Sequence, residues 1–319
     1  MSFLPIQVLT SQLGAWQRQW NEGWMKPERP DWRSAVAALT GAILIWPLVD
    51  RLPMLGFDWR VYFWARDFQQ YPPWTEWALA PLLALPWRLG LSGLNALLLT
   101  TVAIAVSREV YLKAGRITSS TTSEALGCVL LALFTPPVMI LLWVGNIEAV
   151  AMFGMLIMPV GVAWVLLKPH LGLWAVLSRR SWMIWAAAFG IVTLVVWQLW
   201  PMRVLGTVSE RIQHPSAFGW ASLGWPMILL GILLLFRTPP EPLALMAAGC
   251  FFSPFLMPQH FVLFLPALGK VRGGRRLVLW AAAWLLIIPL MFDGWAKCLA
   301  LVFPLVVWWM LQSPLAAQK

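Results

Sequence analysis

Residues 90–107 read GLSGLNALLLTTVAIAVS and contain no charged side chain. Similar apolar runs recur from Ser34 to Leu311, and 60% of the 319 residues are hydrophobic, with a mean hydropathy of +0.73. A bilayer core offers backbone amides no water, so each run must close its hydrogen bonds internally, and continuous runs do so as helices. The sequence therefore predicts an all-α, polytopic transmembrane bundle.

About ten membrane-spanning helices are expected in a single domain at 34–319. They are placed at 35–49, 90–107, 125–144, 147–167, 182–200, 218–236, 242–256, 259–271, 277–292 and 296–311. Several are shorter than the roughly 20 residues that a perpendicular span needs. The pair 242–256 and 259–271 is split by SPFLMPQH, which is equally consistent with a broken or re-entrant element lining a cavity.

Basic residues indicate how the chain is oriented. Ten spans with a cytoplasmic N-terminus put 16 of the 23 Lys and Arg on the cytoplasmic side, Lys168, Arg179 and Arg180 among them. Residues 50–75 then face outward. Because the charge of +10 lies between apolar runs and forms no single stripe, we expect membrane lipids and not nucleic acid as partners. This predicts a multi-pass protein of a bacterial-type plasma membrane.

Residues 1–33 carry an apolar pattern with helical spacing. Leu9, Leu13, Trp16, Trp20 and Trp24 recur every three or four residues and form one face of a helix. We expect this segment to lie on the cytoplasmic membrane surface as an amphipathic helix.

A charged stretch, FDWRVYFWARDFQQYPP at 57–73, interrupts the apolar sequence. If 58–68 is helical, Asp58 and Tyr62 share one face, while Trp59 and Phe63 lie on a neighbouring face that can rest on lipid. This predicts an interfacial helix on the outer leaflet. From the residues alone, Asp58 is as well explained by a functional carboxylate as by an N-cap of that helix.

The segment FDWRVYFWA at 57–65, followed by YPP at 71–73 and PLLALP at 81–86, resembles glycosyltransferase family 87. The matching positions are Asp58, Tyr62, Tyr71, Pro72 and Pro73. Two later segments also resemble this family, through Gly145, Asn146, Lys168 and Pro169 and through Ser253, Pro254 and His260. The family commonly has Gln then Asn after the glycine, whereas this chain has Asn146, Ile147 and Glu148.

The resemblance implies a GT-C-like bundle and an inverting hexosyltransferase. Such an enzyme moves a hexose, mannose-like, from a polyprenyl-phosphate sugar donor to a lipid or glycan acceptor at the outer face. It implies Asp58 as general base. The expected substrate-binding residues are Arg60, Tyr62, Arg66, Tyr71, Asn146, Glu148 and His260. Lys168, although it matches the family, is interpreted as a cytoplasmic topology signal that contacts anionic lipid.

Simpler explanations exist for several of these residues. Arg66 fits a surface ion network with Asp67 or Glu76 nearly as well as donor binding. Glu148 fits a snorkelling or protonated carboxyl group, Asn146 fits a helix cap, and His260 fits an interfacial histidine satisfied by a carbonyl. Two other functions stay open: a transporter or flippase of lipid-linked glycans, and a non-catalytic membrane protein with the same fold.

Cofactor motifs are missing from the sequence. There is no GxxxxGK, GxGxxG or HExxH, only three His, and no clustered pair of carboxylates. No cofactor and no tight metal centre are therefore expected. A weakly held divalent cation that bridges Asp58 or Glu148 to the donor phosphate stays an open alternative.

Overall fold

The computed structural model describes residues 14, 17–18, 20–26 and 29–312. Helices account for its regular structure, and the described residues contain no strand, only an isolated antiparallel bridge between Phe218 and Leu256. The all-α prediction is confirmed. Of the expected N-terminal amphipathic pattern, Leu9, Leu13 and Trp16 lie outside the described residues, whereas Trp20 and Trp24 lie in a helical stretch.

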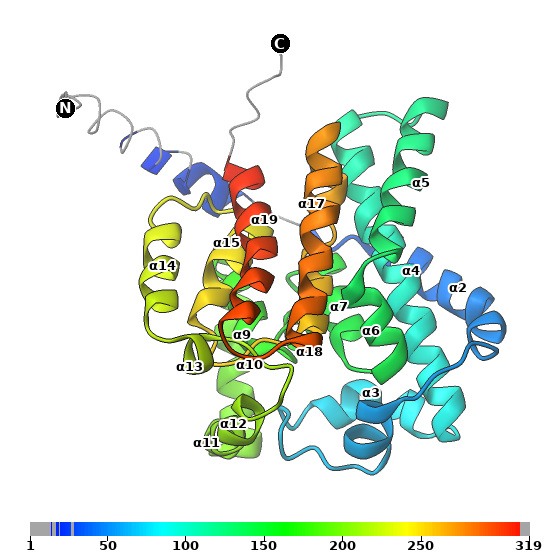
Figure 1. Ribbon diagram of the computed structural model, residues 1–319. Coiled ribbons are helices and arrows are strands. Elements are labelled where there is room, and N and C mark those ends of the chain that lie inside the picture. The colour runs from blue at the N-terminus through cyan, green and yellow to red at the C-terminus, as the bar shows by residue number, and fades with distance from the viewer. Residues whose placement is uncertain (1–13, 15–16, 19, 27–28, 313–319) are drawn as a thin grey trace.

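The first part of the bundle is built on one long helix. Helix α4 (Trp87–Ala114) packs between α2 (Trp32–Val49) and α5 (Ser119–Leu133), as Figure 1 shows. Asp31 caps α2, since its carboxylate accepts hydrogen bonds from the Ser34 backbone N–H (3.1 Å) and hydroxyl (2.7 Å). The connection from α2 to α4 contains η1 (Trp59–Trp64) and α3 (Thr75–Leu83).

The remaining peripheral elements complete the bundle. Helix α6 (Pro136–Val144) follows α5 across a bend of 58°. The later elements are α10 (Arg180–Trp197), α11 (Trp200–Gly206), α12 (Val208–Ile212), α13 (Trp220–Leu223), α14 (Pro226–Leu235), α17 (Gly274–Trp284), η4 (Leu285–Ile287), α18 (Ile288–Met291), η5 (Gly294–Leu301) and α19 (Val302–Gln312).

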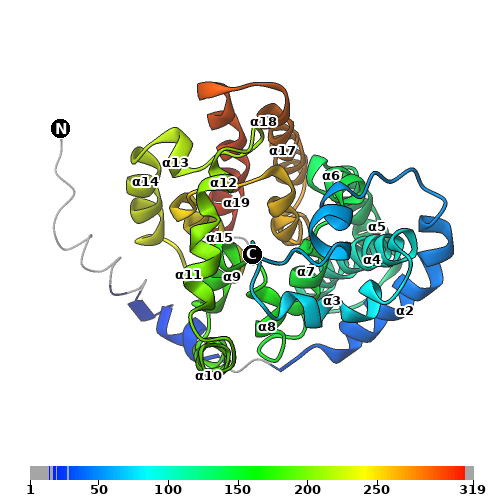
Figure 2. The same ribbon diagram turned by 90° about the horizontal axis from the view of Figure 1, so that it is seen from below.

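The bundle has two ends, which we name after one residue each. The Arg179 end, at the top of Figure 1, contains the connection between α4 and α5 and the start of α17. The Asp58 end, seen from below in Figure 2, contains η1, α3, α11 and α12.

Five helices in the described part of the chain are long and apolar enough to cross a membrane, or six if the bent pair α5 and α6 forms one span. The five segments are Trp32–Val49, Trp87–Ala114, Arg180–Trp197, Gly274–Met291 and Gly294–Gln312. The prediction of about ten spans is therefore not confirmed. The protein is a helical membrane protein in which the remaining apolar segments form shorter helices.

One of these segments, expected as a single span at 147–167, instead turns back on itself. Its elements are α7 (Glu148–Leu156) and α8 (Val162–Val165), which pack together. The turn needs two glycines, because a Cβ on Gly161 would overlap the backbone oxygen of Gly154. Leu156 accepts a hydrogen bond from the Asp31 backbone N–H (3.2 Å), so α7 reaches the Arg179 end before the chain returns.

The position of Lys168 follows from this hairpin. After α8, the chain is back beside the start of α7, and α9 (Pro169–Val176) then runs again toward Arg179. Lys168 therefore lies next to Glu148, at a distance of 2.7 Å between Nζ and Oε1. Our expectation that Lys168 lies on the side opposite Glu148 was wrong.

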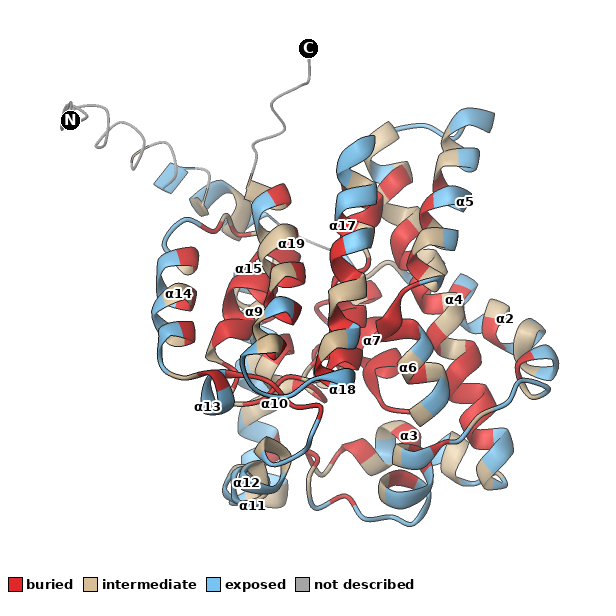
Figure 3. Ribbon diagram, viewed as in Figure 1, coloured by how far each residue is buried: buried red, intermediate tan, exposed pale blue. Residues whose placement is uncertain are grey.

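Residues 242–270 form a second hairpin. It consists of α15 (Pro242–Gly249), η2 (Cys250–Phe252), η3 (Pro258–Phe264) and α16 (Ala267–Lys270). Its two ends meet through an ion pair between Lys270 and Glu241, and its turn lies at 253–257. The re-entrant interpretation of SPFLMPQH agrees with this path. Helices α7 and α15 are buried along almost their whole length, as Figure 3 shows.

The first outer segment differs from the expected lipid-resting helix. Residues Trp59–Trp64 form a short π-helix, and Trp59 and Phe63 are completely buried in the core. The indole of Trp59 fits against Gly90, where a Cβ would lie 2.8 Å from the ring, and donates to the Trp87 carbonyl at 2.8 Å. The prediction that these two aromatic rings rest on lipid was wrong, because facing glycines leave room for them inside the protein.

Candidate functional site

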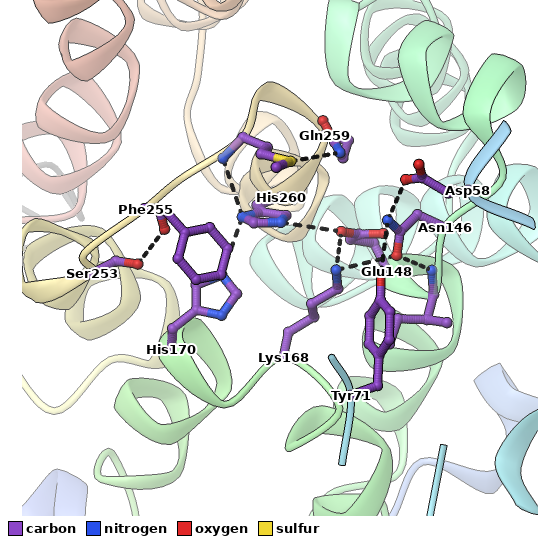
Figure 4. Close-up of polar contacts among 12 residues, drawn as sticks. Asp58, Tyr71, Asn146, Glu148, Lys168, His170, Ser253, Phe255, Gln259 and His260 are labelled. Atoms are coloured by element: carbon purple, nitrogen blue, oxygen red, sulfur yellow. Dashed lines mark hydrogen bonds and ion pairs between the residues drawn. The ribbon is translucent and has the colours of Figure 1, made fainter. Parts of the chain in front are cut away.

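Three segments that are distant in sequence place polar side chains together at the Asp58 end (Figure 4). The first outer segment supplies Asp58 and Tyr71, and the hairpin of α7 and α8 supplies Asn146, Glu148 and Lys168 at its open end. The start of α9 adds His170, and η3 adds His260. We call these seven residues the polar cluster.

Asn146 connects the carboxylate of Asp58 to the rest of the polar cluster. Its Nδ2 donates to Asp58 Oδ2 at 2.6 Å, while its Oδ1 accepts from the Ile147 backbone N–H (2.7 Å) and from Lys168 Nζ (3.2 Å). Two donors therefore fix the orientation of the amide and direct its N–H₂ toward Asp58. The N-cap of α7 is Ile147, without a side-chain cap hydrogen bond, so Asn146 is not a helix cap; its amide holds the carboxylate of Asp58 in place.

Glu148 and Lys168 form a buried ion pair. Their side chains are 0% and 5% exposed, and Lys168 Nζ lies 2.7 Å from Glu148 Oε1. An unpaired charge at such a depth is strongly unfavourable, so each side chain compensates the other. Glu148 is therefore not a snorkelling carboxyl group, which was one of the alternatives that the sequence left open.

His260 and His170 extend the polar cluster on the other side of Glu148. His260 Nδ1 accepts from the Met257 backbone N–H (3.3 Å), which places the proton of a neutral ring on Nε2, 3.7 Å from Glu148 Oε1. His170 Nε2 lies 3.1 Å from the same Nδ1 and is then the donor. A chain of polar contacts thus runs from His170 through His260 to Glu148.

Tyr71 lies between two cations. Lys168 Nζ is 5.5 Å from the centre of its ring, and Arg211 Cζ, from α12, is 5.1 Å away. Arg211 also lies over Phe255, at 5.3 Å. Its Nε and Nη2 are buried and have no hydrogen-bond acceptor among the described residues. Arg211 therefore keeps unused donors beside the polar cluster.

The environment of Asp58 changes its protonation. Burial raises the pKa of Asp58 to about 6; the hydrogen bond from Asn146 opposes this rise, the charge of Glu148 adds to it, and Lys168 opposes it. The carboxyl group is therefore still mostly ionised at neutral pH, yet it is a stronger base than an exposed aspartate. Such a pKa is typical of a group that accepts a proton near pH 7.

The structure brings most of the expected site residues together, with two exceptions. Tyr62 packs beside Tyr71, with ring centres 6.4 Å apart. Arg60 instead lies 5.0 Å over the ring of Trp87, and Arg66 pairs with Glu76 at 3.4 Å, both with exposed side chains. Arg66 therefore belongs to the surface ion network that the sequence offered as an alternative, and Arg60 lies outside the polar cluster.

Two residues near Asp58 were not expected there: Lys168 and His170. A signal for both existed in LLKPHLG at 166–172, where a charged residue and a proline interrupt the apolar sequence. Arg211 is brought to Tyr71 by the folded segment between α10 and α14. Within the described part of the chain, no group of three or more His, Cys, Asp or Glu could hold a metal ion.

Neither a protein-family model, nor a curated protein, nor a solved structure matches this chain.

Proposed function

We propose that this protein is a membrane glycosyltransferase. In this proposal it moves a hexose from a polyprenyl-phosphate donor to a lipid or glycan acceptor at the outer face of a plasma membrane, with Asp58 as general base. The observation that carries the proposal is the polar cluster: a half-buried carboxylate, oriented by Asn146, lies beside the buried cation Lys168 within a helical membrane protein.

The reaction is a single inverting displacement. The acceptor hydroxyl attacks the anomeric carbon of the donor sugar and gives its proton to the Asp58 carboxylate. The bond between the anomeric carbon and the phosphate oxygen breaks, and polyprenyl phosphate leaves with the electron pair. Asn146 keeps Asp58 in position for this transfer through the 2.6 Å hydrogen bond to Oδ2, which leaves Oδ1 to accept the proton.

The leaving phosphate needs donors that stabilise its increasing negative charge. Arg211 suits this task, because two of its guanidinium nitrogens are buried without an acceptor. Lys168 contributes a second positive charge, 5.5 Å from the centre of the Tyr71 ring. His260 offers an N–H at Nε2, which points toward Glu148 in the free protein. These contacts favour a phosphate-linked donor over an uncharged one.

The direct test compares two aspartates in the same outer segment. We expect Asp58→Asn to lower the transfer of labelled hexose from polyprenyl phosphate by roughly 10²–10⁴-fold, the usual contribution of a general base. Asp67→Asn is the matched control, because Asp67 is exposed and lies outside the polar cluster. The purified protein is assayed with short polyprenyl-phosphate donors and a mixed lipid acceptor fraction.

Full activity of Asp58→Asn would remove Asp58 from the mechanism. If the wild-type protein transfers no sugar but moves lipid-linked glycans across vesicle membranes, the transporter alternative replaces the enzyme. The two assays use the same donor lipids and the same purified protein, so they separate these functions directly.

A further inference from the structure

A cavity of about 270 Å³ lies at the Arg179 end of the bundle. Helix α7 connects it to the polar cluster: Glu148 begins α7 at the polar cluster, whereas Met152, Met155 and Leu156 line the cavity. No residue of the polar cluster lines this cavity. It is therefore a separate site, and nothing in the proposed transfer reaction uses it.

The walls of the cavity have two chemical characters. Methionine and leucine side chains form an apolar part, and methionine adapts its shape to flexible apolar groups. Charged side chains form the rest, with five cations and two acids. The cations are Lys26, Arg29, Arg108, Arg179 and Lys270, and the acids are Glu109 and Glu241.

The inner cations of the cavity are already paired, but two at its rim are not. Arg108 pairs with Asp31 at 2.9 Å, and Lys270 pairs with Glu109 and Glu241. The side chains of Lys26 and Arg29 are exposed and form no hydrogen bond or ion pair with any residue that the structure describes. Among the described residues, the rim thus carries positive charge that no acid pairs with.

Trp182 adds an independent observation. It lines the same cavity and is 3% exposed, yet its indole N–H is buried and finds no acceptor within the described ranges. A buried donor without an acceptor costs free energy unless a bound molecule supplies one. A phosphate or ester oxygen is an acceptor of the kind that this indole lacks.

We propose that this cavity binds an anionic glycerophospholipid. Its phosphodiester lies at the rim near Lys26 and Arg29, its ester region lies near Trp182, and the first part of an acyl chain lies against Met152 and Met155. Basic pockets between transmembrane helices bind anionic lipid headgroups for this electrostatic reason. The apolar wall selects a lipid over a free phosphate ion, because only a lipid covers both parts of the cavity.

Native mass spectrometry of the purified full chain in detergent tests this site. The protein is titrated with phosphatidylglycerol, with phosphatidylcholine of the same acyl chains, and with glycerol 3-phosphate. One phosphatidylglycerol is expected to stay bound at concentrations where phosphatidylcholine does not. The double variant Lys26→Gln/Arg29→Gln should weaken this binding about tenfold, because each basic residue near a lipid surface contributes to anionic-lipid affinity.

Two further variants separate the cavity from general surface charge. Met155→Trp fills the apolar part, and Trp182→Phe removes the indole N–H while keeping a ring; both should weaken phosphatidylglycerol binding. Arg116→Gln is the matched control, because Arg116 is an exposed cation at the same end outside the cavity, and it should change nothing. Thermal unfolding in detergent identifies a variant that fails to fold. The phosphatidylglycerol binding of the remaining, folded variants then tests the proposal.

Equal retention of phosphatidylglycerol and phosphatidylcholine by the wild-type protein would overturn the proposal. Unchanged binding in the Lys26→Gln/Arg29→Gln variant would also overturn it. If glycerol 3-phosphate displaces the lipid at equal concentration, the cavity is a phosphate site and not a lipid site. None of these readouts depends on sugar transfer, so their outcome is distinct from that of the Asp58 test.

Discussion

Two lysine–glutamate groups lie at opposite ends of the same bundle. At the Asp58 end, Lys168 pairs with the single acid Glu148, and the two side chains are 5% and 0% exposed. At the Arg179 end, Lys270 pairs with Glu109 and Glu241, and its side chain is 27% exposed. The chemistry of the contacts is the same, but the access to water is not.

The difference in burial assigns different tasks to the two groups. Lys270 joins the two ends of the hairpin 242–270 at a position where water screens the charges. Its ion pairs therefore hold these two ends together. Lys168 and Glu148 pay a large desolvation cost, since neither charge reaches water. This buried ion pair fixes the open end of the hairpin of α7 and α8, and it keeps the Lys168 ammonium group close to Asn146.

Replacement of Lys168 by methionine should have the largest effect on stability. It leaves Glu148 buried without a partner, which is expected to lower the free energy of unfolding by about 3–5 kcal/mol. The measurement is thermal or denaturant unfolding of the purified protein in detergent, followed by circular dichroism.

The double variant Lys168→Met/Glu148→Leu is the control for this prediction. Because it removes both charges, it should recover most of the stability that the single variant loses. A double variant as unstable as Lys168→Met alone would show that the ion pair is not what stabilises this end of the bundle.

The pH dependence of activity tests the role of Asp58 at its end of the bundle. Because the pKa of Asp58 is raised to about 6, its carboxylate is ionised above that pH and protonated below it. A protonated Asp58 accepts no proton, so kcat/KM should fall as pH falls through 6 and be about tenfold lower at pH 5 than at its plateau. Unfolding curves at pH 5 and 7 show whether the protein stays folded. A flat profile between these pH values would contradict the assigned base.

The sequence predicts the peripheral helices better than the inner ones. Apolar length alone locates α2 and α10 within about three residues of their observed bounds, since each is one continuous apolar helix with little of its surface buried in the protein. It does not distinguish a span from a hairpin at 147–167, because both need the same number of apolar residues. The contact between Gly154 and Gly161 decides between them, and it exists only in three dimensions.

The same limit applies to the polar cluster. The order of the family-like segments predicts Asp58, Tyr71, Asn146, Glu148 and His260 as neighbours, and the structure places them together. Counting one span for 147–167 placed Lys168 on the side opposite Glu148, whereas the two side chains lie 2.7 Å apart. Arg211 reaches Tyr71 only because the segment between α10 and α14 folds over the Asp58 end, and no local pattern records such a contact.

Replacement of Lys270 by methionine should have the smallest effect. Two carboxylates lose their partner, but water reaches both, so a loss of about 1 kcal/mol or less is expected. High salt should reduce this loss, since it partly screens these half-buried pairs, and it should leave the cost of Lys168→Met almost unchanged. The measurement is unfolding of both variants in detergent at low and high salt. A Lys270→Met variant as unstable as Lys168→Met would mean that burial does not distinguish the two groups.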